Sequence, residues 1–184
     1  MADPYLLNGF FETQLVTGCL PESHDVDAAL ADLLIQAGNG QIDRVAAPVQ
    51  KVAECALRLA ARFTRDIGAG ASARYRWEWE ASIERGTPVF RSGPFWSLLY
   101  SPHEPGRTEL ELEDPRLPWI LIEEPNLRFR DRPGGPVWEH HHRLELGPGK
   151  VVMFPAWLRR QVRGQDPVLR IDLWALLNGE GSGR

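Results

Sequence analysis

The fold is decided by residues 149–162, which read GKVVMFPAWLRRQV, and by residues 168–177, which read VLRIDLWALL. Both segments are rich in valine, leucine and aromatic residues, and glycine and proline lie at their borders. These features predict strands at residues 150–154, 161–162 and 168–177. Toward the N-terminus, the same criteria predict five further strands, at residues 74–83, 95–101, 108–112, 119–122 and 137–146.

Two amphipathic helices are predicted before these strands. Apolar residues at helical spacing indicate a first helix that begins near residue 23 and ends at residues 38–40. Pro48 suits the first turn of a second helix, which has an apolar stripe over residues 49–63 and ends at Gly68. A short strand is also expected earlier, at residues 10–16.

Eight short strands after two helices favour a mainly β, α+β fold, a jelly roll braced by two N-terminal helices. The helical brace covers about residues 23–68, and the β core covers about residues 74–177. We expect residues 1–177 to form one domain, with a hinge at residues 68–72 and a disordered tail at residues 178–184.

Composition excludes several classes of function. A net charge of −4 gives no global field that would recruit nucleic acid or an anionic membrane. No apolar run approaches the roughly 20 residues that cross a bilayer, and the first residues do not read as a secretory signal. The two cysteines, Cys19 and Cys55, are expected to be reduced and buried rather than paired. These features together predict a cytoplasmic protein.

Five landmarks along the chain occur in the order of a known family. They resemble a small bacterial family of iron(II)/2-oxoglutarate oxygenases, and the resemblance covers nearly the whole chain. It implies a double-stranded β-helix, a form of jelly roll, for which a homodimer is a reasonable expectation. The landmarks are Phe11-x-Thr13-x-Leu15, Trp79 seven residues before Gly86, Gly93-x-x-Trp96-Ser97-x-x-Tyr100, ELELEDPR at residues 109–116, and residues 149–162.

The chain departs from the family at the iron ligands. Val89 and Arg91 stand at the family's H-x-H/D element, Arg160 stands at its distal histidine, and Ala81 replaces its asparagine. A guanidinium repels a divalent metal, so the resemblance implies no metal ligands and no cofactor. Arg170 matches the arginine that binds 2-oxoglutarate in the family. The interior is therefore predicted to be electropositive and free of transition metal.

The arginines Arg91, Arg160 and Arg170 are all expected to point into this interior. A buried, unpaired guanidinium is costly, so the three need acidic partners or an anionic ligand. One interpretation is a site for a carboxylate or enolate, to which the guanidiniums donate paired hydrogen bonds. The other is a set of internal ion pairs, with Glu78, Glu80 or Asp172 as partners. Arg159 and Arg163 are expected to be surface charges.

Histidines cluster at residues 139–142, which read EHHH. In a strand, His140 and His142 share one face and His141 lies on the other. The cluster can be a solvated hairpin, a metal site completed by another ligand, or the source of a general base. Candidates for the third metal ligand are His103, Glu104 and Asp172.

Aromatic and acidic residues complete the candidate site. Tryptophans at positions 79, 96, 157 and 174 are more often core residues than cavity walls, and Trp96 and Trp174 are placed near a cavity wall. Glu109, Glu111 and Glu113 alternate with leucine and are predicted to form a solvated strand face.

The favoured hypothesis is a metal-independent cyclase, isomerase or lyase of specialised biosynthesis that acts on a small anionic or conjugated molecule. Preorganised guanidiniums would stabilise negative charge, and Glu80 or a histidine would transfer the proton. Two alternatives stay open: an Fe(II)/2-oxoglutarate hydroxylase with relocated ligands, and a non-catalytic small-molecule-binding protein. The assigned catalytic residues are Arg91, Arg160, Glu80, His140 and His142, and the substrate-binding residues are Arg170, Trp79, Trp96, Tyr100 and Trp174.

Overall fold

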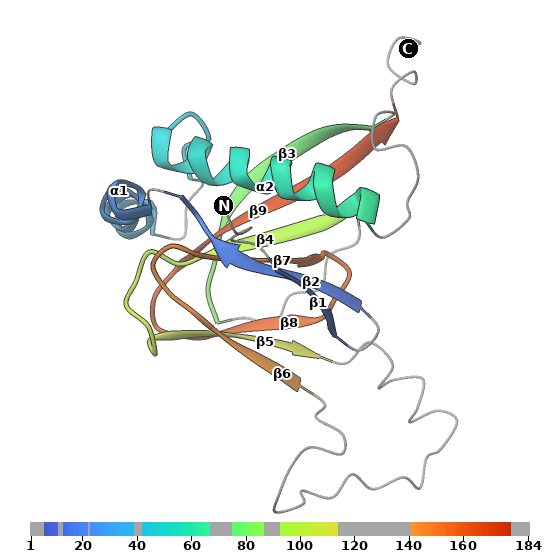
Figure 1. Cartoon of the computed structure of the whole chain (residues 1–184). Coiled ribbons are helices and arrows are strands. Elements are labelled where there is room, and N and C mark those ends of the chain that lie inside the picture. Colours follow the sequence, from blue (N-terminus) through green and yellow to red (C-terminus); the bar gives the residue numbers. More distant parts are fainter. Residues whose placement is uncertain are drawn as a thin grey trace, which may run out of the picture.

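Two antiparallel sheets and two helices make up the computed structural model (Figure 1). It describes residues 6–10, 13–21, 23–38, 42–66, 75–86, 93–113 and 141–177. The larger sheet has the strand order β1-β2-β7-β4-β9-β3, and the smaller sheet has the order β6-β5-β8. The strands of the larger sheet are β1 (Leu6–Phe10), β2 (Thr13–Cys19), β7 (Lys150–Pro155), β4 (Trp96–Tyr100), β9 (Val168–Leu177) and β3 (Tyr75–Glu84).

The smaller sheet consists of β6 (His141–Leu146), β5 (Thr108–Glu113) and β8 (Arg160–Gly164). Strands that are distant in sequence are neighbours in space, since β3 pairs with β9 and β5 pairs with β8. This crossing pattern over two sheets confirms the predicted jelly roll of the double-stranded β-helix type.

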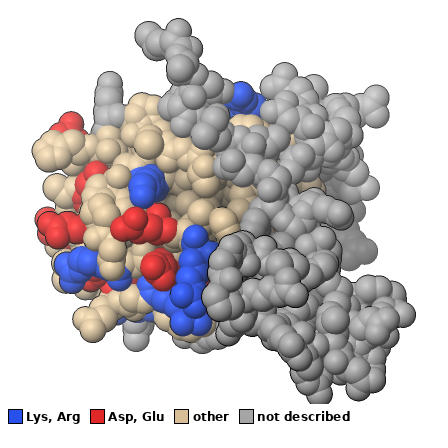
Figure 2. Space-filling view, turned by 60° about the horizontal axis from the view of Figure 1, so that its bottom comes forward, with Lys and Arg blue, Asp and Glu red and all other residues tan. Residues whose placement is uncertain are grey.

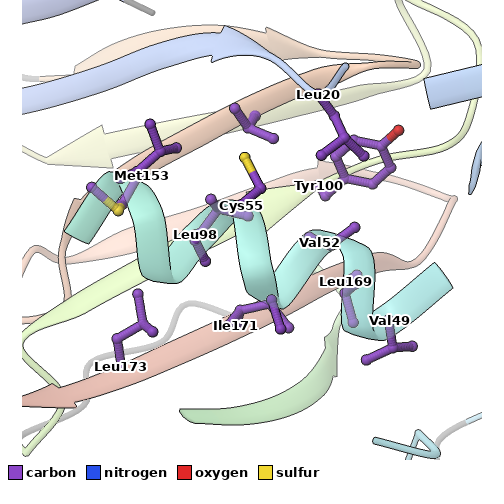
Figure 3. Packing of buried hydrophobic residues seen from close by; sticks show 14 of the residues in the cluster. Leu20, Val49, Val52, Cys55, Leu98, Tyr100, Met153, Leu169, Ile171 and Leu173 are labelled. Carbon is purple, nitrogen blue, oxygen red and sulfur yellow. The ribbon is translucent and has the colours of Figure 1, made fainter. Parts of the chain in front are cut away.

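Both predicted helices are present, and helix α1 is Ser23–Ala37 and helix α2 is Ala47–Asp66. Helix α2 lies across the outer face of the larger sheet, and α1 packs beside α2 (Figure 1). The predicted stripe of α2 is buried against residues of β4 and β9, including Leu98, Leu169 and Ile171 (Figure 3). Apolar residues that recur with the 3.6-residue period of the helix form one stripe, and this stripe packs on the outer face of the sheet.

A second core lies between the two sheets. Leu99, Val152 and Phe154 of the larger sheet belong to one buried cluster with Leu110 and Val162 of the smaller sheet. Side chains alternate along each strand, so β9 directs Leu169 and Ile171 to the helices, and Arg170 to the smaller sheet. This second face positions the candidate site.

The predicted strand ends agree with the structure within a few residues, with one clear correction. The single strand expected at residues 10–16 is instead a pair of strands, β1 and β2, which are antiparallel neighbours. The strand expected at residues 119–122, the hinge at 68–72, the stop at Gly68 and the tail at 178–184 lie outside the described residues.

Two further features concern the helices and the thiols. Neither described helix is long and apolar enough to cross a membrane. Both cysteines are free, as expected. Cys55 is buried, but the prediction was wrong for Cys19, which is exposed on the last position of β2.

Candidate functional site

The β3–β9 pair has one apolar face and one polar face. Trp77, Trp79, Ala81 and Ile83 pack against the core beneath α2. Because side chains alternate, the even-numbered residues of β3 lie on the opposite face, toward the smaller sheet. The last of them, Glu84, is only 2% exposed. A carboxylate is thus carried into the space between the sheets.

Arg160, the first residue of β8, binds this carboxylate. Its Nε donates to both Glu84 oxygens at 3.2 and 3.3 Å, and its Nη2 donates to Glu84 Oε2 at 3.2 Å. The side chain of Arg160 is fully buried, and its Cζ lies 5.2 Å from the centre of the Phe154 ring. These contacts join β8 of the smaller sheet to β3 and β7 of the larger sheet.

Arg170 binds the same carboxylate from β9. Its Nη1 donates to Glu84 Oε2 at 2.8 Å. Its Nε lies 3.1 Å from Asp172 Oδ2, which is close enough for an ion pair, although this N–H does not point at the oxygen as a hydrogen bond requires. Asp172 Oδ1 accepts a hydrogen bond of 2.5 Å from Ser97 Oγ. We call Glu84, Arg160, Arg170 and Asp172 the buried ion network.

Two donors of the buried ion network make no hydrogen bond to a described residue, Arg170 Nε, which still lies within ion-pair distance of Asp172, and Arg160 Nη1. Arg160 Nη1 is buried and has no hydrogen-bond partner among the described residues. An unsatisfied buried donor on a charged group is costly, so such an atom calls for an explanation.

The network corrects two predictions. Arg160 and Arg170 do lie together between the sheets, and Asp172, one of the predicted partners, is paired with Arg170. The partner that the two arginines share is Glu84, which was not among the predicted partners. The expected electropositive interior is wrong for the described residues, because the two guanidiniums face two carboxylates. Arg91 lies outside the described residues. Strand alternation is the signal that would have placed Glu84 on the inner face.

A cleft lies at the other end of the β3–β9 pair. Its volume is about 620 Å³, and its walls include Trp77, Trp79, Trp174, Glu78, Glu80 and Arg44. In the strand register, Glu78 is opposite Trp174 and Glu80 is opposite Asp172. The side chains on this face of the β3–β9 pair therefore form a row that runs from the cleft, through Asp172, to the buried ion network. We call this the tryptophan cleft.

Trp96 and Tyr100 are not cavity residues, which corrects their assignment. Both are at most 1% exposed and face the helices, because the alternation of β4 turns Ser97 and Leu99 toward the smaller sheet instead. Trp96 Nε1 donates to Thr64 Oγ1 at 2.9 Å. Their positions in the core give them no contact with a ligand between the sheets.

Tyr100 joins three parts of the fold. Its hydroxyl donates to Asp27 Oδ1 of α1 at 2.5 Å and accepts from the backbone N–H of Gly149 at 3.3 Å. Burial raises the pKa of the Tyr100 hydroxyl far above its ordinary value, and the adjacent Asp27 raises this pKa further. Tyr100 therefore stays neutral and has a structural role.

The histidines lie on opposite faces of the smaller sheet. His141 Nδ1 is 3.5 Å from Glu111 Oε1 on the outer face. His142 pairs with the inward-facing Leu112, which in turn pairs with Arg160, so His142 belongs to the inner face. His140 lies outside the described residues. Within the described part of the chain, no group of three or more His, Cys, Asp or Glu residues is placed to hold a metal ion.

Glu111 is buried and ion-paired, which corrects its assignment to a solvated face. It accepts hydrogen bonds from Arg143 Nε at 3.0 Å and from Arg163 Nη2 at 2.9 Å. Burial opposes ionisation of Glu111, but the two arginines outweigh it and hold the pKa of its carboxyl below the usual value. Acidic and basic side chains lie beside one another on the described surface when the bottom of Figure 1 is turned forward (Figure 2).

The donor set around Arg160 does not fit the iron that the resemblance would imply. A divalent cation at this position would face two permanent cations, Arg160 and Arg170, and the nearby carboxylates are already paired to them. A second carboxylate compound at Arg170 would likewise have to displace Glu84 or Asp172. The described residues are therefore not arranged to bind either iron or a second carboxylate in the way that the resemblance implies.

No family model and no curated protein matches the chain. The solved structures that are similar to the chain include these three. One is a prolyl-4-hydroxylase from Pseudomonas putida, at 17% identity, 90% and 88% coverage of this chain and that chain, and a TM-score of 0.47. Another is iron-bound HygX from Streptomyces hygroscopicus, at 13% identity, 88% and 81% coverage, and a TM-score of 0.47.

The third is an oxidoreductase of the 2OG-Fe(II) oxygenase family from Burkholderia pseudomallei, at 12% identity, 98% and 76% coverage, and a TM-score of 0.35. All three TM-scores are below 0.5, so the assignment of the fold rests on the strand order of the two sheets. Fold and site together define a double-stranded β-helix protein with a buried ion network between its sheets.

Proposed function

We propose that this chain is a metal-independent enzyme, a cyclase, isomerase or lyase that acts on a small anionic or conjugated metabolite of specialised biosynthesis. The observation that supports it is the unpaired donor Arg160 Nη1, buried between the sheets beside a second guanidinium. Donors held in place before reaction stabilise negative charge that develops on an oxygen, such as that of an enolate. Glu84 holds the Arg160 fork in position for that task.

The other residues of the proposed site lie along the β3–β9 pair and on β6. Trp174, on the same face of the strand pair as Glu78 and Glu80, provides a flat apolar wall that holds a conjugated group in a reactive shape. Glu80 is exposed in the same cleft and is the candidate for the proton transfer. Arg170 orients the network through Glu84 and Asp172, and His142 is the second candidate acid–base group on the inner face.

A binding experiment on the metal-stripped full chain tests this proposal. Acetate, succinate and 2-oxoglutarate are titrated by calorimetry into the wild-type chain and into Arg160→Lys, which keeps the charge but removes Nη1. A hydrogen bond to a charged group contributes about 1.5–3 kcal/mol, so the affinity for a bound carboxylate should fall about ten- to a hundredfold. Arg159→Gln is the matched control, since Arg159 is 65% exposed on the adjacent position.

Two outcomes contradict the proposal. One is that none of the carboxylates binds, and the other is that Arg160→Lys and Arg159→Gln bind them as well as the wild-type chain does. Binding that depends on Arg160 but leads to no conversion of any bound metabolite would favour the non-catalytic binding protein instead.

A hydroxylase with relocated ligands is the second candidate, because His142 lies on the inner face in the same cross-strand row as Arg160. Iron content after anaerobic reconstitution and conversion of 2-oxoglutarate to succinate together test this second candidate. This candidate requires stoichiometric iron that is lost in His142→Ala. A His142→Ala variant with unchanged iron content and turnover would rule out His142 as a ligand.

A further inference from the structure

The tryptophan cleft carries chemistry that the buried ion network does not use. Its described lining includes the tryptophans Trp77, Trp79 and Trp174 and the carboxylates Glu78 and Glu80. Trp77 and Trp79 pack toward the core beneath α2, so Trp174 is the indole on the same face as the two carboxylates. The face of an indole ring is electrostatically negative and attracts cations. Within the described wall, the carboxylates outnumber the single basic side chain, Arg44. Both features favour a positively charged occupant.

Arg44 already binds this wall as a cation. Its guanidinium carbon lies 4.5 Å from the centre of the Trp79 ring, and its Nη2 donates to the Trp79 carbonyl oxygen. The backbone carbonyl of Arg44 accepts a hydrogen bond of 2.7 Å from Gln50 Nε2, which anchors it at the start of α2. The chain therefore uses one indole of the cleft for an internal cation–π contact.

The other groups of the cleft remain for a ligand. Glu78 is paired with Arg76 at 2.6 Å, whereas Glu80 is exposed and has no ion pair to another described residue. In the strand register, Trp174 is directly opposite Glu78, and Glu80 is the next residue of β3 on the same face. An indole and a carboxylate at this spacing form two sides of a cation site.

We propose that the tryptophan cleft binds a cationic nitrogen group of the substrate, such as a quaternary ammonium or a guanidinium, between Trp174 and Glu80. This inference rests on the proposed function, since it names the class of small molecule that the same β3–β9 pair would bind. The cationic group lies at the open end of the strand pair, and the reacting part of the molecule extends toward Arg160.

The test uses tetramethylammonium chloride as the cation and tert-butanol as a neutral probe of similar shape. Indole N–H resonances of the full chain are followed by NMR, with Trp79 and Trp174 assigned from single Trp→Phe variants. We expect tetramethylammonium to shift the Trp174 resonance saturably and tert-butanol to leave it unchanged, while Trp79, on the opposite face of the strand pair, serves as the internal reference. Glu80→Gln should weaken binding about two- to fivefold, the usual effect of one exposed charge, while Glu109→Gln should not change it.

Arg44→Ala provides a test with the opposite sign. Removal of the internal cation takes one positive charge out of the cleft lining and should tighten tetramethylammonium binding about two- to fivefold, the usual effect of one exposed charge. A circular dichroism spectrum confirms that each variant is folded. Equal binding of tert-butanol, no saturable shift, or weaker binding in Arg44→Ala would each overturn the inference.

These readouts do not depend on turnover, so they separate this inference from the proposed function. Cation binding that persists in Arg160→Lys supports the cleft even if no carboxylate binds the wild-type chain. Loss of cation binding in the wild-type chain, with carboxylate binding that depends on Arg160, overturns the cleft alone.

Discussion

Glu84 determines whether two guanidiniums can be buried between the sheets. It is the common partner of Arg160 and Arg170, and all three side chains are at most 4% exposed. Glu84→Gln removes the negative charge and leaves both cations buried. We expect the free energy of unfolding to fall by about 3–5 kcal/mol, the cost of breaking a buried ion pair from one side. Urea denaturation measures it, with the exposed Glu109→Gln as the control.

The double variant Glu84→Leu with Arg160→Met separates the contribution of the ion pair from the cost of leaving one buried charge without its partner. Replacing both partners by apolar residues should recover part of the loss, because no buried charge is left without a partner at that position. Equal stability of Glu84→Gln and Glu109→Gln would show that the network contributes nothing to folding.

Glu111 gives the molecule an acid-sensitive contact on its outer face. The pKa of its carboxyl is lower in the folded chain than in the unfolded chain, chiefly because hydrogen bonds from Arg143 and Arg163 outweigh the effect of burial. Glu111 therefore adds stability at pH values above its ordinary pKa of about 4.3, and this stability is lost as the pH falls toward the lower folded pKa.

We expect Glu111→Gln to remove this acid-side dependence and to cost about 0.2–1 kcal/mol at neutral pH, because its partners Arg143 and Arg163 are half exposed. Unfolding midpoints between pH 3 and pH 7 measure the slope, with Glu109→Gln as the comparison. An unchanged slope in Glu111→Gln would assign the acid sensitivity to other carboxylates.

For single residues, the sequence predicted where the arginines lie better than it predicted which residues they bind. Arg160 and Arg170 were correctly placed between the sheets, but Glu84 was missed, although two-residue alternation from Trp77 and Trp79 puts it on the inner face. The same alternation explains the wrong placement of Trp96. A strand pattern shows that two faces exist, but not which of them the helices cover.

At the scale of elements, Tyr100 of β4 ties helix α1 to the turn before β7. Its hydroxyl bonds both Asp27 and the N–H of Gly149. Tyr100→Phe leaves these groups without that partner, so the free energy of unfolding should fall by about 1–3 kcal/mol. Thr17→Ser, on strand β2, which β7 separates from β4, serves as a conservative control, and urea denaturation measures both variants.

Alkaline pH gives the same contact a second readout. Burial raises the pKa of Tyr100 in the folded chain, so its contribution is complete below the unfolded pKa of about 10 and decreases as the pH rises above it. Tyr100→Phe should therefore lose less stability between pH 9 and pH 11 than the wild-type chain. Parallel pH profiles would contradict this assignment.

The elements themselves were largely predictable, because their signals are local. The apolar stripe of α2 and the strands around Lys150 and Val168 appear within a few residues of their predicted ends. The division of residues 6–19 into β1 and β2 was not predicted, because strand pairing there depends on contact between β2 and β7, far along the chain. Long-range pairing carries no local signal.

At the scale of the whole molecule, the two sheets are joined by an apolar core and by the buried ion network. In this arrangement the positive charges between the sheets belong to the chain itself, as the guanidiniums of Arg160 and Arg170. Carboxylates that are already paired have little to offer a divalent ion. The stability of the fold should then be independent of metal.

A chelation experiment measures this independence. Thermal unfolding of the full chain is recorded with EDTA, without additions, and with excess Fe(II) under anaerobic conditions, and we expect three equal midpoints. An ion present at a hundred times its Kd would add about 2.7 kcal/mol, which raises the midpoint of a chain of this size by about 5–10 °C. A rise of that size with iron, reversed by EDTA, would show that metal binds the folded barrel and that the guanidiniums do not replace it.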